Sequence, residues 1–192
     1  MAGRGMKTDH ELVAQIRAGD QRAFVELIDR YKARIYHTSL RILGHREDAE
    51  EASQDTFVRA YRGLENFRED ATFSTWIYRI CVNACLNKLE SRKRFKVQDI
   101  DKTPIEELPF TASPEAEFAD EDLESRVFSA VEKLPAKYRT VLVLYHIQHL
   151  AYQEIATIMQ MPMGSVKTHL FRARALLRER VLQEFSPEEL IA

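Results

Sequence analysis

The sequence predicts an all-α protein built from two small helical domains joined by a flexible acidic linker. Apolar residues recur three and four positions apart from Asp9 to about Lys96 and again from Leu123 onward, which is the spacing of amphipathic helices. Between these stretches the helical spacing fades, and three prolines interrupt any helix. No strand pattern is convincing. The expected organisation is a domain over residues 1–96, a linker over 97–122 and a domain over 123–192, with the hydrophobic core divided between the domains.

The first domain is predicted to contain four helices. Gly19-Asp20 and Gly44 mark two of the helix ends, because glycine commonly follows the last helical turn. In the second domain, helical spacing resumes at Leu123 and runs to Leu134, which Pro135 follows.

Charge is distributed very unevenly along the chain. The formal net charge is only -2 at pH 7 for the 192 residues. Residues 97–125 hold ten acidic side chains and one lysine, whereas residues 137–182 hold seven lysines and arginines and two glutamates. The average therefore hides a basic C-terminal unit behind an acidic connector, and a basic unit of this kind is the electrostatic footprint of a nucleic-acid binder.

The C-terminal unit has the pattern of a helix-turn-helix. Residues 151–159 can form one short helix, Pro162 stops it, and a second helix is expected to begin near Ser165 as its N-cap. Ala156 is small enough for the two helices to cross closely, as the DNA-binding form of this motif requires. Ala151 is a weaker cap for the first helix than serine or threonine.

The second helix of this motif favours DNA binding over a merely solvated surface. Its cations begin in the N-terminal half, the end that reaches base edges in a major groove, and one acid, Glu179, accompanies them. A single arginine would favour the solvated surface. The side chains expected to face DNA are Lys167, Thr168, Phe171, Arg172 and Arg174.

An acidic segment lies in the first domain. Residues 47–55 hold five acids and no cation, and helical spacing puts Asp48, Glu51 and Asp55 on one face. Such a face repels DNA and suits a basic protein partner, although a solvated helix face is the usual explanation of a charge run. Without a Glu-x-x-His pair the segment gives little support to a di-metal site, and no metal or other cofactor is expected.

Aromatic and cationic side chains alternate downstream of the acidic segment. Residues 77–96 hold six cations and one acid, and the preceding residues 67–78 include four aromatic side chains that offer stacking faces to unpaired bases. Trp76 is expected to belong mostly to the core. Asn83 and Asn87 lie four apart on a basic helix, where two amides can read base edges, and the loop from Arg68 to Thr75 is a candidate site for an unpaired base.

Two features bear on compartment. Cys81 and Cys85 lie on one face of a helix without a second ligand pair, so buried free thiols are expected rather than zinc ligands. The N-terminus lacks the apolar stretch of a signal peptide, and no run approaches the length of a membrane span. We therefore expect a cytoplasmic protein.

Three segments in this order resemble a bacterial sigma-70 family sigma factor of group IV, the extracytoplasmic function (ECF) class. They are "DAEEASQDTFVRAY", "NFREDATFSTWIYRICVNACLNKL" and "LPAKYRTVLVLYHIQHLAYQEIATIMQMPMGSVKTHLFRARALLRE". The resemblance covers roughly residues 9–181. It implies a sigma2-like domain, a linker along the RNA exit path and a sigma4-like domain, without the long amino-terminal domain of housekeeping sigma factors.

The resemblance also implies roles for matching positions. Contacts to the clamp helices of the largest subunit of core RNA polymerase would come from Asp48, Glu51, Gln54, Asp55 and Phe57. Recognition and melting of the -10 promoter element would use Phe67, Arg68, Phe73, Ser74, Thr75, Arg79, Asn83, Asn87 and Lys88. Recognition of the -35 element would use Arg139, Tyr152, Ser165, Lys167, Thr168, Phe171, Arg172 and Arg174.

The implied partners are core RNA polymerase, through its clamp helices and flap region, promoter DNA, and an anti-sigma factor that is often membrane-bound. No small-molecule substrate or catalysis is implied, and the chain would be nucleoid-associated when active. Lys167 and His169 replace the arginines of many relatives, and Ala151-Tyr152-Gln153 replaces a more usual Ser-Tyr-Glu, which bears on the fine preference at -35.

Two other classes of protein fit parts of the sequence. An ordinary DNA-binding regulator predicts tight binding of duplex DNA by the isolated chain and no affinity for core polymerase. A metal-dependent hydrolase that uses the acidic segment predicts metal-dependent turnover, and the lack of histidine partners and of a nucleophile counts against it.

Overall fold

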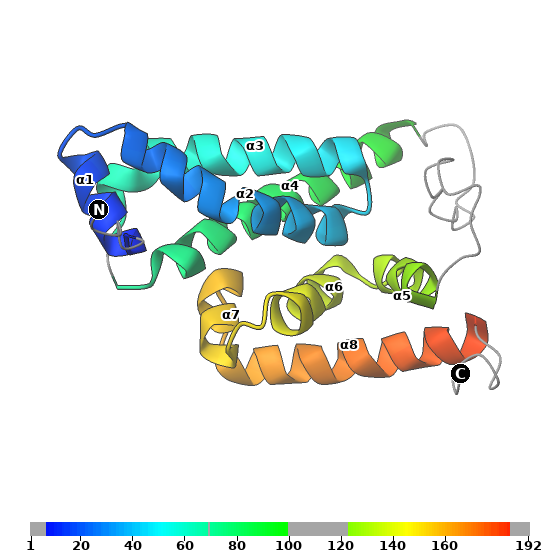
Figure 1. The fold of residues 1–192 in the computed structure, drawn as a ribbon. Coiled ribbons are helices and arrows are strands. Elements are labelled where there is room, and N and C mark those ends of the chain that lie inside the picture. The colour runs from blue at the N-terminus through cyan, green and yellow to red at the C-terminus, as the bar shows by residue number, and fades with distance from the viewer. Residues whose placement is uncertain (1–6, 69, 100–122, 185–192) are drawn as a thin grey trace.

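The computed structural model describes residues 7–68, 70–99 and 123–184, and every regular element in these ranges is helical (Figure 1). The prediction of an all-α protein is confirmed. The elements are α1 (Asp9–Arg17), α2 (Arg22–Leu43), α3 (Arg46–Gly63), η1 (Leu64–Asn66), α4 (Phe73–Asp99), α5 (Leu123–Glu132), α6 (Ala136–Leu142), η3 (Val143–Ile147), α7 (Tyr152–Met159) and α8 (Met163–Glu184).

Local sequence explains where the first helices begin and end. Thr8 is the N-cap of α1: its hydroxyl accepts the N–H of Glu11, and the Glu11 carboxylate accepts the Thr8 N–H. Gly19 and Gly44 follow α1 and α2 with φ of 98° and 66°, conformations that favour glycine. The four predicted α-helices of the N-terminal part are therefore present, with two of their ends at the predicted glycines.

Helix α4 ends at Asp99, close to the predicted end near Lys96, and residues 100–122 of the predicted linker lie outside the described residues. The predicted N-cap of the last helix is wrong. Helix α8 begins at Met163, so Ser165 lies in its first turn and is not an N-cap. The fixed φ of Pro162 suits a helix start, and the Pro162 carbonyl accepts the N–H groups of Ser165 and Val166.

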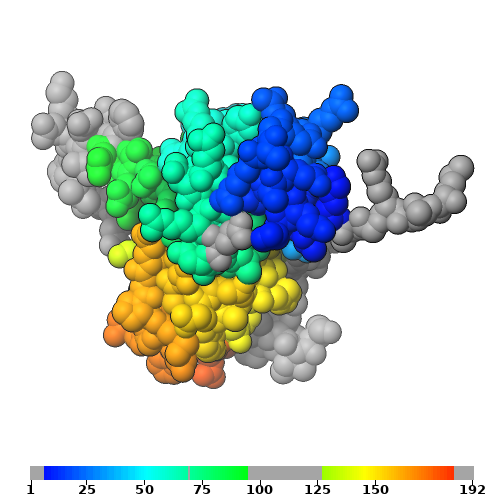
Figure 2. All heavy atoms as spheres, turned by 90° about the vertical axis from the view of Figure 1, so that its left-hand side faces the viewer, coloured from blue at the N-terminus to red at the C-terminus, as the bar shows by residue number. Residues whose placement is uncertain are grey.

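The helices form two groups that pack on each other. Helix α3 contacts α2 and α4, while α8 runs beneath α5, α6 and α7 (Figure 1). Helix α4 also contacts α6 and α7, and Figure 2 shows the C-terminal helices lying directly against the N-terminal ones. Across this boundary the Tyr78 hydroxyl donates to Oε1 of Gln148 at 2.6 Å, and burial raises the pKa of Tyr78 to about 12.

The core is therefore continuous, whereas the sequence pattern predicted a divided one. The physical reason is the central part of α4, which has apolar side chains on more than one face. Its Cys81 side packs toward α2, where Ser39 lies 3.3 Å from the thiol, and Tyr78 meets the C-terminal group. Cys81 and Cys85 are buried free thiols, as predicted. No described helix is long and apolar enough to cross a bilayer.

Candidate protein and nucleic-acid interfaces

The acidic face of α3 is partly neutralised by α4. Asp48 Oδ1 lies 3.1 Å from Nζ of Lys88, and Glu51 Oε2 lies 2.5 Å from the same nitrogen. Arg92 forms a further ion pair with Asp48. We call these four side chains, Asp48, Glu51, Lys88 and Arg92, the α3–α4 charge cluster.

The members of the cluster differ in exposure. The side chains of Asp48, Lys88 and Arg92 are 17%, 20% and 33% exposed, whereas Glu51 is 74% exposed. Burial lowers the pKa of Arg92. Glu51 and the exposed Gln54 are therefore the most solvent-accessible side chains on this part of the face, although Glu51 is paired with Lys88.

The other predicted docking residues on α3 lie one to two turns further along. Asp55 Oδ2 pairs with Arg59 of its own helix at 2.7 Å, and both side chains are more than a third exposed. Phe57 is partly buried and packs against the core. The sequence pattern indicates this face but not the two cations that reach it from α4, because they lie 37 or more positions away in the chain.

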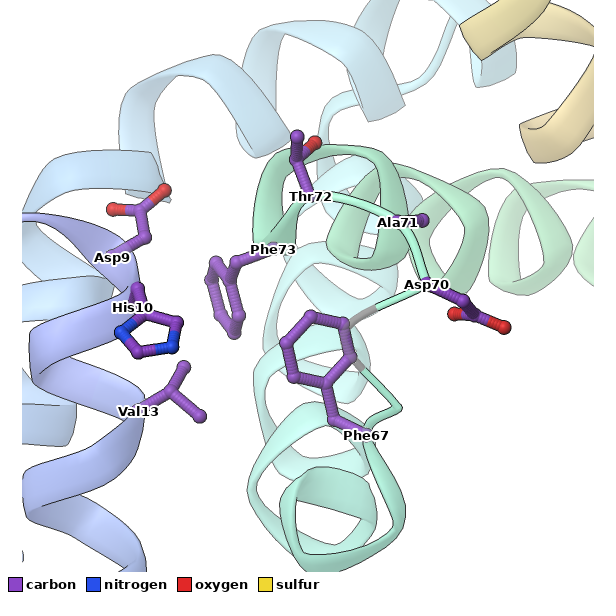
Figure 3. A pocket seen from close by; sticks show the side chains of 8 residues that line it. All are labelled: Asp9, His10, Val13, Phe67, Asp70, Ala71, Thr72 and Phe73. Carbon is purple, nitrogen blue, oxygen red and sulfur yellow. The ribbon is translucent and has the colours of Figure 1, made fainter.

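The loop between η1 and α4 borders a cavity of about 570 Å³ (Figure 3). Phe67 and Phe73 are buried and lie edge to face with ring centroids 6.0 Å apart. Across the cavity, α1 contributes His10 and Val13, which nothing in the sequence pattern connects to this loop. The full lining is Asp9, His10, Val13, Phe67, Asp70, Ala71, Thr72 and Phe73.

The other predicted residues of this loop are either exposed to solvent or buried at the start of α4. Arg68 is exposed and Ser74 half-buried. Thr75 is buried, and its N–H donates to Oγ1 of Thr72 at 3.1 Å at the beginning of α4. Trp76 is partly buried, with its ring 4.9 Å from that of Phe67, in agreement with a mostly structural role.

The predicted -10 residues of α4 lie on two different faces of the helix. Asn83 and Asn87 are exposed, and the half-buried Arg79 precedes them at the same four-residue spacing, so the three share a face. Lys88 lies about 100° further round the helix, turned toward α3. The structure thus brings together Arg79, Asn83 and Asn87 and places Lys88 in the charge cluster instead.

Helices α7 and α8 form the predicted helix-turn-helix. Gln160 ends α7 in the left-handed conformation with φ of 51°, and Ile155, Val166 and Leu170 are at most 1% exposed where the two helices pack. At the start of α7, the Ala151 N–H donates to the Glu154 carboxylate at 2.8 Å, which compensates for the missing hydroxyl cap.

The outward face of α8 is basic and open. Phe171 is 75% exposed. The other exposed side chains among those predicted to face DNA are Lys167, Thr168, Arg172 and Arg174. Ser165 is half-buried in the first turn.

Arg174 is held by residues that the sequence pattern did not reveal. Its guanidinium donates to Nε2 of His146 at 3.2 Å and lies 5.3 Å from the ring centre of Tyr145. Tyr145 in turn packs against the half-buried Tyr152 at 5.1 Å. Burial and the nearby Arg174 lower the pKa of His146, so the imidazole is neutral at pH 7 and accepts the arginine's hydrogen bond.

Arg139 is not on this basic face. It is 6% exposed and donates to the Glu132 carbonyl at 2.8 Å, while burial lowers its pKa. In this structure it joins α5 to α6 and offers no surface to DNA.

Two family descriptions match this chain. Residues 27–95 match Sigma-70 region 2, and residues 125–177 match Sigma-70, region 4. The chain is 36% identical to the RNA polymerase sigma-H factor of Pseudomonas aeruginosa over 183 residues, covering 91% of this chain and 94% of that one. It is 35% identical to the ECF RNA polymerase sigma factor SigW of Bacillus subtilis, covering 88% and 94%. The chain belongs to the ECF sigma factors of the sigma-70 family.

Two solved structures share the fold. CnrH in complex with the cytosolic domain of CnrY matches with a TM-score of 0.67 and 26% identity, covering 93% of this chain and 99% of that one. The sigma factor RpoE of Bartonella quintana, in complex with the anti-sigma factor NepR, matches with a TM-score of 0.65 and 23% identity, covering 82% and 96%.

Membership of the family sets the kind of function. An ECF sigma factor is a specificity subunit of bacterial RNA polymerase and has no catalysis of its own. Region 2 spans most of α2, all of α3, the loop after it and most of α4, and region 4 spans the C-terminal helices from α5 into α8, with the helix-turn-helix among them. Among the described residues, no group of three or more histidine, cysteine or acidic side chains is placed to hold a metal ion.

Proposed function

We propose that this sigma factor docks on core RNA polymerase through α3, opens the -10 element with the η1–α4 loop and α4, and reads the -35 element with α8. Residues 1–96 would form the sigma2-like domain, 97–122 the linker and 123–192 the sigma4-like domain. The observation that supports this division is the separation of charge: α3 presents acids to solvent, whereas α8 has no acid between Met163 and Arg178. A basic protein surface and DNA are the partners that these two faces respectively attract.

The -10 assignment rests on shape and exposure. Arg68, Asn83 and Asn87 are open to single-stranded DNA, and the cavity beside Phe67 and Phe73 offers an aromatic wall to an extruded base. Extrusion costs a few kcal/mol, which contacts in such a cavity offset. Thr75 would act by starting α4 and holding the loop, since it is buried.

The -35 assignment rests on α8. Its exposed Lys167, Thr168 and Arg172 have the chemistry that base edges and phosphates accept in a major groove, and Phe171 offers an apolar surface to thymine methyl groups. Tyr152 would contribute indirectly, by packing on the Tyr145 that supports Arg174.

Regulation would follow that of the structural relatives. CnrH and RpoE were solved with CnrY and the anti-sigma factor NepR, respectively. An anti-sigma factor would hold this chain inactive, at the membrane where that partner is membrane-bound, and its release would let the chain act in the cytoplasm at the nucleoid.

The decisive experiment is the affinity of the purified chain for bacterial core RNA polymerase at two salt concentrations. Asp55→Lys reverses a charge on the docking face without touching α4, and it should weaken binding roughly 10- to 100-fold at the lower salt. Asp48→Lys should abolish docking, but it disturbs the charge cluster as well.

Asp29→Lys is the matched control, because Asp29 is an exposed α2 carboxylate paired with Lys32 of the same helix. It makes the same charge change away from α3 and should leave the affinity unchanged. Equal losses for Asp29→Lys and Asp55→Lys would refute the docking face, and no binding of the unmodified chain would refute the proposed function.

A further inference from the structure

The α3–α4 charge cluster joins two surfaces that the proposed function uses separately. Two of its members, Asp48 and Glu51, belong to the polymerase-docking face of α3. The other two, Lys88 and Arg92, belong to the basic half of α4, next to the single-strand face of Asn83 and Asn87. Each ion pair of the cluster therefore joins an acid of the docking face to a cation of the basic half of α4.

The cluster differs from the other ion pairs of α3. Arg46 with Glu50, and Asp55 with Arg59, are pairs within the helix between well-exposed side chains. Asp48 instead contacts two cations from another helix, and His45 Nδ1 lies 3.9 Å from its carboxylate, so this single acid is shared by three basic groups.

The position of Lys88 and Arg92 follows from the register of α4. They follow Cys81 and Cys85 by one and two turns on the same stripe of α4, and there their side chains reach the acids of α3. Lys88 and Arg92 are long and flexible, and at 20% and 33% exposure their charged ends remain within reach of solvent. They can reorient from α3 toward an outside anion without unfolding the helix.

Each partner of the cluster has a competitor in the proposed assembly. A DNA phosphate competes with the carboxylates of Asp48 and Glu51 for the two cations. A basic polymerase surface competes with the two cations for the same carboxylates. Binding of either partner therefore breaks the ion pairs between α3 and α4, so the other partner no longer has to break them. Polymerase docking and DNA binding should then strengthen each other equally, because such coupling is reciprocal.

We propose that the α3–α4 charge cluster is a latch that couples polymerase docking to capture of the -10 single strand. In the free chain Asp48 and Glu51 hold Lys88 and Arg92 against α3. Docking of polymerase on the acids releases the cations to bind phosphates. The inference rests on the proposed function for its polymerase half, while its DNA half is testable on the isolated chain.

The first test measures binding of a fluorescent oligothymidine to the isolated chain. Phosphate contacts do not depend on sequence, so this probe reports release of the cations. Asp48→Asn should tighten binding roughly 3- to 10-fold, and Asp48→Asn with Glu51→Gln should tighten it further. The salt dependence of binding should steepen by about 0.7 for each phosphate of this single strand that a released cation neutralises.

Asp55→Asn is the matched control, because it removes the same charge from the same helix while Asp55 pairs with Arg59 of α3 and not with a cation of α4 in the described part of the chain. It should change oligothymidine binding much less than Asp48→Asn does. Equal tightening in both variants would show long-range charge alone and would overturn the latch, as would unchanged or weaker binding by Asp48→Asn.

The second test measures polymerase affinity of the Lys88→Gln variant in the absence of DNA. A latch predicts tighter docking, roughly 2- to 5-fold, because the carboxylates lose their internal competitor. Weaker docking would mean that Lys88 only organises α3, and it would overturn the proposal. If Asp48→Asn, Asp55→Asn and Lys88→Gln all leave docking unchanged while the oligothymidine result holds, the docking face is wrong and the release of the cations stands.

Discussion

Helices α3 and α8 are both strongly charged, but the structure treats their charges differently. On α3 the charge is balanced by side chains of a neighbouring helix, and Asp48 is only 17% exposed. On α8 the cations lie on a face with no acid from Met163 to Arg178, and only Arg174 has a described hydrogen bond to another side chain, the neutral His146. A charge run in a sequence therefore does not show whether the charge is free.

The largest expected difference lies between Leu170 and Phe171, neighbours in α8 of which one is buried and the other lies on the exposed basic face. Leu170 is 1% exposed at the crossing with α7, whereas Phe171 is 75% exposed. Leu170→Ala should lower the free energy of unfolding by about 2–5 kcal/mol, because it opens a cavity. Phe171→Ala should change it by less than about 0.5 kcal/mol and weaken -35 binding instead. Urea unfolding of both variants measures the difference, and similar losses of stability would place Phe171 in the core.

The next largest effect is expected at Arg172. Arg172→Ala should weaken holoenzyme binding to a promoter fragment by about 1–3 kcal/mol where the guanidinium makes one bidentate base contact. Arg178→Ala, two turns further along α8, should reduce affinity for all DNA sequences alike, as loss of a phosphate contact does. Competition between fragments with intact and scrambled -35 elements separates the two, and equal loss on both fragments for Arg172→Ala would make it a phosphate contact.

Features set by neighbouring residues were predictable from the sequence. The glycine ends of α1 and α2, the helix-turn-helix and the exposed cations of α8 depend on contacts within a few positions. Helix α8 begins before the predicted N-cap Ser165, because the conformational preference of Pro162 outweighed the capping preference of Ser165.

Features set by long-range packing were not predictable. Nothing in the sequence connects Asp48 with Lys88 and Arg92, because these cations lie far away in the chain. The burial of Arg139 depends on how α6 packs against α4, and the cavity beside Phe67 has a second wall from α1. Periodicity identifies which face of a helix is buried, but it does not say which other helix covers it.

The contact of Tyr78 with Gln148, between the two helical groups, should have a smaller effect on the free energy of unfolding, and this effect should depend on pH. Burial raises the pKa of Tyr78 to about 12, from about 10 in the unfolded chain. Between these pH values the unfolded chain loses the proton and the folded chain keeps it, so the free energy of unfolding should fall as pH rises from about 10 to 12. Burial and Asp9 also raise the pKa of Tyr31, which adds to the same slope.

Tyr78→Phe should make this slope shallower and lower stability at pH 7 by about 0.5–1.5 kcal/mol, because the bond to Gln148 is lost. Chemical unfolding at pH 7 and at several pH values above 9 measures both effects. A slope as steep as that of the unmodified chain would mean that Tyr78 ionises as freely in the folded chain as in the unfolded one.

The smallest difference is expected within α3 itself, where Glu50 and Asp48 provide two kinds of ion pair two residues apart. Glu50 is 51% exposed and pairs with Arg46 at 76% exposure, so Glu50→Gln should change the free energy of unfolding by less than about 0.5 kcal/mol. Asp48→Asn leaves Lys88 and Arg92 facing each other with one acid fewer and should cost about 1 kcal/mol at low salt. Thermal unfolding at low and high salt resolves the pair, because added salt screens the repulsion between the two cations and should reduce the loss in Asp48→Asn. Equal and negligible losses of stability in both variants would show that the ion pairs of the α3–α4 charge cluster add no stability beyond what solvent provides. The difference between α3 and α8 would then lie in the arrangement of their charges and not in the free energy of unfolding.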